Sequence, residues 1–212
     1  KDLAYGVPIR IPMIDIHSIG AGGGSIARVD QAGMLRVGPE SAGSFPGPIG
    51  YGRGGTQPTI TDANFLLGRL NPEVITGSNT EASLDQIDQA FADLGDPLGL
   101  TSLQAALAVI EIGVNDLAGV IRLTAIDKGH DPRDFALMPY GGAGPLHAVA
   151  IARELGIPQV LVPRFPGLTS ALGCVLADVR HDFVQMINRL FDGIDKREVE
   201  QLMVMQAEEG SR

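Results

Sequence analysis

The chain has 212 residues, a formal net charge of −9 at pH 7 and 44% hydrophobic residues. A surface that binds nucleic acid needs clustered Lys and Arg, so this acidic balance argues against nucleic acid as a partner. No apolar run is long enough to cross a bilayer, and the sequence shows no signal peptide, so we expect no membrane partner.

The 28 glycines favour a soluble α/β protein with many functional loops. The single cysteine, Cys174, excludes an internal disulfide framework and suits a reducing, cytoplasmic compartment. It lies in the apolar run 171–176, so we expect a buried structural thiol. The chain begins at Lys1 without a methionine and ends inside a helical pattern, which predicts a piece of a longer polypeptide.

The first predicted elements are short β-prone runs. An apolar run from Ile11 to Ile16 is followed by a glycine-dense turn and by the runs Ile26–Val29 and Met34–Val37. Runs of this kind, broken by glycine-containing turns, predict two successive hairpins.

The first turn, Gly20–Ser25, has four glycines in its first five positions. Glycine allows backbone N–H groups to crowd into a concavity that attracts phosphate, so we expect a phosphate cradle with Asp15 and His17 beside it. A tight hairpin that simply needs glycine is the alternative. No amphipathic helix follows, which disfavours a Rossmann site, and no Gly-Lys-Ser/Thr follows, which excludes a P-loop.

The next stretch, residues 38–80, reads as a long loop insertion. Its prolines and glycines exclude regular structure up to about Thr59, and a loop of this length in a compact domain is functional or disordered. We favour a functional loop. Asp62 is predicted to cap a helix from Ala63 to Leu70, or else to face the site as a metal or water ligand.

Two helices follow, over Ser83–Phe91 and from about Thr101 to Lys128. Asn115 in the second helix either makes an interhelical hydrogen bond or points at a ligand. The apolar positions of that helix recur every three or four residues and predict one stripe packed on a sheet; they are Leu103, Ala106, Leu107, Ile110, Val114, Leu117, Val120, Ile121 and Leu123.

A buried strand, Phe135–Tyr140, then runs into the turn Gly141–Pro145, the helix Leu146–Leu155 and the strand Gln159–Val162. A strand, a glycine-rich turn and a helix N-terminus with proline in its first turn make a nucleotide-type site. The two strands and the helix predict a right-handed βαβ unit.

The last predicted elements are a helix from about Phe165 to Leu176, a strand over Val179–Asn188 and a helix over Asp195–Glu209.

Seven motifs, in this order, closely resemble the hydantoinase A/5-oxoprolinase family and cover roughly residues 1–182. They are Asp15–Ala27, Gly38–Gly43, Tyr51–Gly55, Thr61–Asn64, Gly129–Asp134, Gly141–Ala148 and Leu168–Gly173.

The resemblance implies an α/β fold: one lobe of an actin-like (ribonuclease H-like) ATPase. We expect a mixed sheet with β-hairpins first and the βαβ unit later, and helices on both faces. Residues 1–190 would form the second nucleotide-binding lobe, with 38–80 inserted, and residues 191–212 would begin a helical segment. The remainder of the enzyme would lie outside this chain.

The family resemblance also implies ATP-coupled opening of a cyclic amide such as hydantoin, N-methylhydantoin or 5-oxoproline, with ATP activating a carbonyl by phosphorylation. Related proteins are ATP-using subunits of acetone and acetophenone carboxylases, and a non-catalytic nucleotide-binding module is a further alternative. The implied partners are a divalent metal (Mg or Mn), a hydantoinase B-like second subunit and further copies in an oligomer. The isolated chain would be inactive.

Residue by residue, Gly22, Gly23, Gly24 and Ser25 would lie at the phosphates. Gly141, Gly142 and Gly144 would approach the adenosine, with Asn115 as a further cofactor contact.

The expected catalytic residues are Asp15, His17 and Asp62, and Asp15 and His17 are also the candidate metal ligands. Asp15 could instead brace the glycine loop, and His147 could serve only to cap or pack. Two departures from the oxoprolinase branch, at His17 and at Gly144–Pro145, favour the hydantoinase or carboxylase type. Many family members have cysteine where Gly50 stands, so a thiol role there is missing.

Overall fold

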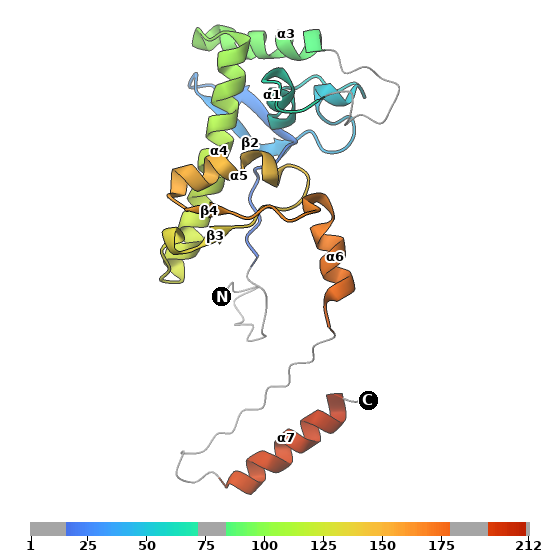
Figure 1. Ribbon diagram of the computed structural model, residues 1–212. Helices are drawn as coiled ribbons and strands as arrows, with labels where there is room; N and C mark the ends of the chain where they lie inside the picture. Colours follow the sequence, from blue (N-terminus) through green and yellow to red (C-terminus); the bar gives the residue numbers. More distant parts are fainter. Residues whose placement is uncertain (1–15, 72–83, 179–194, 211–212) are drawn as a thin grey trace. The chain divides into compact units, whose positions relative to one another are not determined.

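The computed structural model describes residues 16–71, 84–178 and 195–210 (Figure 1). The main compact unit is His17–Gly173, and the described residues outside it belong to a second unit. The main unit is an α/β structure, with a β-hairpin first, helices in the middle and a βαβ unit last.

The hairpin consists of the antiparallel strands β1 (Ser25–Val29) and β2 (Leu35–Ser41), in a register that pairs Ala27 with Val37. It is the second of the two predicted hairpins. The predicted first strand lies outside the described residues, except for Ile16, which is not in a strand.

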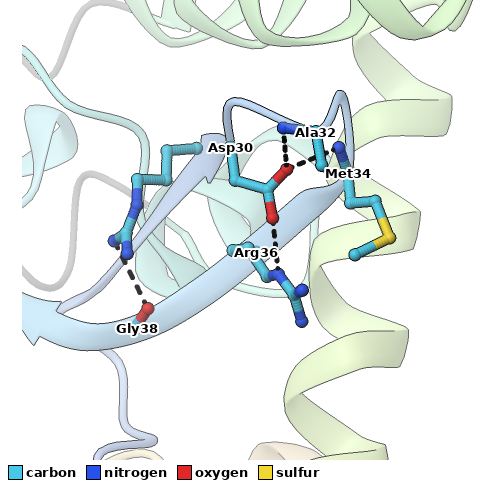
Figure 2. A network of polar contacts seen from close by, with 6 residues as sticks. Asp30, Ala32, Met34, Arg36 and Gly38 are labelled. Carbon is cyan, nitrogen blue, oxygen red and sulfur yellow. Dashed lines mark hydrogen bonds and ion pairs between the residues drawn. The ribbon is translucent and has the colours of Figure 1, made fainter.

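The turn of the hairpin is held by the carboxylate of Asp30 (Figure 2). One oxygen accepts from the backbone N–H groups of Ala32 and Met34 at 2.9 and 3.0 Å, and the other accepts from Arg36 Nε at 2.9 Å. These donors lower the pKa of Asp30, the Met34 N–H first and the Arg36 side chain second. The turn is therefore specified by local side-chain chemistry.

Between β2 and the next helix, the predicted loop contains one 3₁₀ turn, Ile49–Tyr51. Helix α1 follows at Ile60–Leu66. The prediction that Asp62 caps a helix beginning at Ala63 was wrong in position. Thr59 is the N-cap, and Asp62 is the third helical residue and completes a capping box with it.

The long helices are α3 (Leu84–Gly95) and α4 (Ser102–Asp127), joined by the 3₁₀ turn Asp96–Leu98. Thr101 and Gln104 form the capping box of α4. This helix packs against α1, α3, α5 and β2, and so runs beside both the hairpin and the βαβ unit (Figure 1).

The buried face of α4 differs from the predicted stripe. Leu103, Leu107 and Leu123 are exposed. The buried residues are Ala105, Ala106, Val109, Ile110, Gly113, Val114 and Ala118. The face is rotated toward small residues because α4 packs mainly on other helices, where small side chains allow close approach.

The βαβ unit was correctly predicted: β3 (Ala136–Leu137) and β4 (Gln159–Val160) are parallel and are joined by α5 (Gly144–Leu155). A 3₁₀ turn, Pro132–Asp134, precedes β3. The predicted burial of the first strand was wrong, since Phe135, Met138 and Tyr140 are 49–57% exposed. Among the described residues, β3 has a strand neighbour on one edge only.

The described strands form two separate two-stranded sheets, one antiparallel and one parallel, and not one mixed sheet. One hydrophobic core nevertheless runs through the main unit, from Ala27 in the hairpin through Phe91 in α3 and Val109 in α4 to Ile151 in α5. No single helix of the described ranges is long and apolar enough to cross a membrane. The bent pair α3–α4 passes that test of length and composition only when its two helices are taken together.

The last described elements are a 3₁₀ turn (Pro166–Leu168), α6 (Thr169–Leu176) and α7 (Lys196–Gly210). Both helices were predicted, and the predicted strand between them lies outside the described residues. The expected burial of Cys174 was wrong: its thiol is exposed, and so are the apolar side chains beside it in α6.

Candidate functional site

The first glycine loop is braced by Ser25. The buried hydroxyl of Ser25 accepts from the Gly22 N–H at 2.9 Å and donates to the Gly20 carbonyl oxygen at 3.2 Å. Its own N–H donates to the Gly22 carbonyl oxygen at 2.9 Å. Ser25 therefore fixes the shape of the loop through these three hydrogen bonds.

The carbonyl groups of Gly23 and Gly24 accept hydrogen bonds from neighbouring segments. The Gly23 oxygen accepts from both the N–H and the hydroxyl of Thr61 at 2.8 Å, and the Gly24 oxygen accepts from the Ala42 N–H at 2.8 Å. A Cβ on Gly23 would lie 2.8 Å from Thr61 Oγ1, and one on Gly24 would lie 2.8 Å from Ser41 Oγ. A side chain at either position would therefore force the neighbouring hydroxyl group to move.

The N–H groups of Gly23 and Gly24 make no hydrogen bond to an acceptor of the described residues. Because glycines leave such groups accessible, these two amides are available to an anionic ligand.

The second glycine loop has an open surface. Gly141 has a φ of 83°, and its N–H donates to the Pro166 carbonyl oxygen at 2.9 Å. A Cβ on Gly142 would meet nothing within 4 Å. Helix α5 starts at Gly144 with no side-chain cap, so its first N–H groups are left for another acceptor.

The two loops meet, as a Cβ on Gly23 would lie 3.7 Å from Ala143 Cβ. A cavity of about 470 Å³ opens between them, with both loops and α1 in its walls. Its lining is Gly23, Gly24, Gly43, Pro48, Tyr51, Thr61, Asn64, Leu70, Gly142, Ala143 and Leu146. A second, mostly apolar cavity of about 360 Å³ shares Gly23 and Ala143 with it and reaches His147 and the end of β3.

Two residues that line these cavities each have a buried polar atom without a hydrogen-bond partner among the described residues. Asn64 is 1% exposed; its Nδ2 donates to the Ile60 carbonyl oxygen at 2.9 Å, while its Oδ1 is the unsatisfied atom. His147 is 6% exposed, and its unsatisfied atom is Nε2. Burial, with a smaller contribution from the charge of Arg69, lowers the pKa of His147, so the ring is neutral at pH 7.

Asn64 was not among the predicted site residues, and His147 was predicted only to cap or pack. Both occupy core-facing positions near the beginning of a helix that adjoins a glycine loop. A polar residue at a position where the helical pattern expects an apolar one was the available signal.

Asp62 is fully buried in the main unit. Oδ2 accepts from the Thr59 hydroxyl at 2.7 Å, the Thr59 N–H at 3.0 Å and the Ile49 N–H at 3.2 Å, and Oδ1 accepts from the Gly50 N–H at 2.7 Å. Burial raises the pKa of the carboxyl group, and these four donors act in the opposite direction. The carboxylate joins the long loop to the start of α1.

Gly50, the position at which many family members have cysteine, is packed tightly. A Cβ there would lie 2.4 Å from the Phe65 ring and 3.3 Å from Asp62 Oδ1. In this structure, a larger side chain would have to displace the core.

The other predicted residues lie elsewhere. His17 is exposed at the start of the segment that leads into the first loop, and Asp15 lies outside the described residues. Asn115 is exposed on α4 and lines neither cavity, contrary to its expected position near the apolar stripe. In the described part of the chain, no group of three or more His, Cys, Asp or Glu residues is placed to hold a metal ion.

A third hollow, of about 540 Å³, lies beside the Gly129–Asp134 motif and contains neither glycine loop. The Arg133 guanidinium donates to both carboxylate oxygens of Asp131, at 2.6 to 3.0 Å, and lowers the pKa of that carboxyl group to about 2. Arg133 and Asp131 therefore form an ion pair within this motif.

The relatives described here are longer than this chain. It is 39% identical to the caprolactamase alpha subunit of Pseudomonas jessenii over 95% of this chain and 30% of that protein. It is 41% identical to 5-oxoprolinase of Saccharomyces cerevisiae over 84% of this chain and 15% of that protein.

Two solved structures are similar as well. The crystal structure of the ATP-dependent caprolactamase matches 95% of this chain and 30% of its own, with a TM-score of 0.79 and 37% identity. Nucleotide-free acetone carboxylase matches 76% of this chain and 23% of its own, with a TM-score of 0.69 and 36% identity. The hydantoinase/oxoprolinase sequence profile matches residues 2–183, and the chain belongs to that family.

Proposed function

We propose that this chain is the second nucleotide-binding lobe of an actin-like, ATP-dependent enzyme that opens cyclic amides. The observation that carries the proposal is the meeting of the two glycine loops, at Gly23 and Ala143, along one cavity. Relatives named as 5-oxoprolinase and as an ATP-dependent caprolactamase support the reaction class. The chain spans less than a third of these relatives, so the activity is proposed for the longer protein.

In this proposal, the N–H groups of Gly23 and Gly24 bind the phosphates, with Gly22 and Ser25 fixing the shape of the loop. Gly142 and Gly144 give the adenosine access to bare backbone at the start of α5. When bound, ATP supplies the phosphoryl group that activates the amide carbonyl. Backbone donors held rigidly in place stabilise the charge of such a group without reorganising.

We assign Asp62 a positioning role because its carboxylate is buried and fully engaged with Thr59, Ile49 and Gly50. Asp15 and His17, which precede the first loop in the sequence, remain our proposed catalytic pair. A divalent metal, Mg or Mn, would need carboxylates that neither cavity provides within the described ranges, so we derive no step through it.

The relatives include a protein named as an alpha subunit, and we propose a second, hydantoinase B-like subunit and an oligomeric, cytoplasmic enzyme. The second candidate function is the ATP-using subunit of a ketone carboxylase. The similarity to acetone carboxylase, at 36% identity, favours it.

The test uses the complete polypeptide that carries this chain, together with its presumed second subunit. ADP release is followed with hydantoin, N-methylhydantoin, 5-oxoproline and caprolactam, and with acetone plus bicarbonate. We expect one cyclic amide to stimulate ADP release. Stimulation only by acetone with bicarbonate would instead establish the carboxylase, and no nucleotide binding by calorimetry would refute both.

Gly142→Val is the informative variant, because an added Cβ there meets nothing within 4 Å among the described residues and would occupy space that we assign to the nucleotide. It should fold normally and lose ADP release at least tenfold. The matched control is Gly119→Val in α4, where an added Cβ also meets nothing within 4 Å. Equal activity of the two variants would remove the second glycine loop from the site.

A further inference from the structure

Asn64 lines the cavity of about 470 Å³ between the two glycine loops, and the proposed function gives it no role. The direction of its carboxamide is fixed, because Nδ2 faces the Ile60 carbonyl oxygen at 2.9 Å and must be the donor there. The free end of the side chain is therefore an acceptor. Oδ1 is buried, and no donor of the described residues satisfies it. Leaving such an atom unpaired costs free energy that a bound donor would recover.

The chemistry of the cavity indicates the kind of donor. No carboxylate of the described residues lines it, so a divalent cation, which prefers several oxygen ligands, is disfavoured there. Residues of both glycine loops line the cavity: Gly23 and Gly24 of the first loop, and Gly142 and Ala143 of the second. A neutral hydroxyl or N–H group fits an acceptor located between a phosphate-binding and an adenosine-binding loop.

We propose that Asn64 Oδ1 accepts a hydrogen bond from a ribose hydroxyl group of the nucleotide. The inference rests on the proposed function, because the assignment of the two loops fixes which part of the nucleotide lies between them. The ribose is the only part of ATP that separates the phosphates from the base. The half-buried Tyr51 and Leu70 border the same cavity.

The experiment compares binding of ATP, 2′-deoxy-ATP, 3′-deoxy-ATP and inosine triphosphate by calorimetry, using the complete polypeptide. We expect the wild type to bind one deoxy analogue about tenfold more weakly than ATP, as for loss of one hydrogen bond. Asn64→Ala should bind ATP about tenfold more weakly and bind that analogue as the wild type does. Circular dichroism melting establishes that the variant is folded, and Asn64→Leu replaces it if it is not.

Three results would overturn the proposal. A wild type that binds ATP and both deoxy analogues equally has no ribose contact of this kind. A variant that weakens all four nucleotides by the same factor has lost only a structural residue. A loss confined to nucleotides that carry the 6-amino group would assign Oδ1 to the base. Absence of any nucleotide binding by the wild type would instead refute the proposed function itself.

Discussion

The two glycine loops differ in why they contain glycine. In the first loop, an added Cβ on Gly23 or Gly24 would lie 2.8 Å from a side-chain oxygen of the same protein. In the second loop, Gly141 has a positive φ, but Gly142 and Gly144 face space in which the nearest contact to an added Cβ is 3.9 Å or further. The packing accounts for Gly23 and Gly24 of the first loop, but not for Gly22 or for Gly142 and Gly144 of the second loop.

This difference separates structural from ligand-dependent requirements. A glycine that the fold needs should cost stability when it is replaced. A glycine that only a ligand needs should cost binding alone. The following variants test that division, beginning with the support beneath the first loop.

Asp62→Ala should have the largest effect. It removes the acceptor for the buried N–H groups of Ile49, Gly50 and Thr59, and each buried donor left unpaired costs about 1–3 kcal/mol. We expect the free energy of unfolding to fall by about 3 kcal/mol in urea denaturation. The control is Asp116→Asn, an exposed carboxylate in α4. If the two variants are equally stable, the buried carboxylate is not what holds the long loop.

Gly23→Ala should be next, because Thr61 Oγ1 would have to leave the Gly23 carbonyl oxygen to make room. Overpacking of this kind costs about 1–3 kcal/mol. Gly22→Ala in the same loop is the matched comparison, since a Cβ there meets nothing within 4 Å. Thermal melting that ranks Gly22→Ala below Gly23→Ala would contradict the packing account.

Gly141→Ala and Gly142→Ala divide the second loop in the same way. Gly141 has a φ of 83°, and this left-handed conformation costs a non-glycine residue about 1–2 kcal/mol. Gly142→Ala should stay within about 0.5 kcal/mol of the wild type, as surface substitutions usually do. Chemical denaturation of both variants makes the measurement. A large loss of stability for Gly142→Ala would mean that the fold needs this glycine after all.

The smallest expected effect is the pH dependence caused by His147. Its folded-state pKa is lowered from 6.5 by burial, so the unfolded chain binds the proton more tightly. The stability that the neutral ring contributes is present above pH 6.5 and is lost as the pH falls from there toward the lowered pKa. Denaturation of wild type and His147→Gln at pH 8 and pH 5 should show that the difference between the two proteins changes with pH. A constant difference would place the ring in contact with solvent.

Local patterns predicted the hairpin, the βαβ unit and the helix from Thr101, because turn residues, capping boxes and helical periodicity act within a few residues. The contact of Asp62 with the long loop could not be predicted, because the two loop donors lie 12 and 13 residues away in a segment without periodicity. The buried face of α4 and the exposure of β3 depend on which elements pack beside them. Sequence spacing alone does not contain that information.

The carbonyl oxygen of Gly23 is gripped twice by one residue, through the N–H and the hydroxyl of Thr61. Thr61 belongs to the first turn of α1, which packs in turn against α3 and α4. A displacement of the first glycine loop must therefore either break both hydrogen bonds or move α1 as well. The rate of amide hydrogen exchange in the first turn of α1 would then report movement of the first glycine loop.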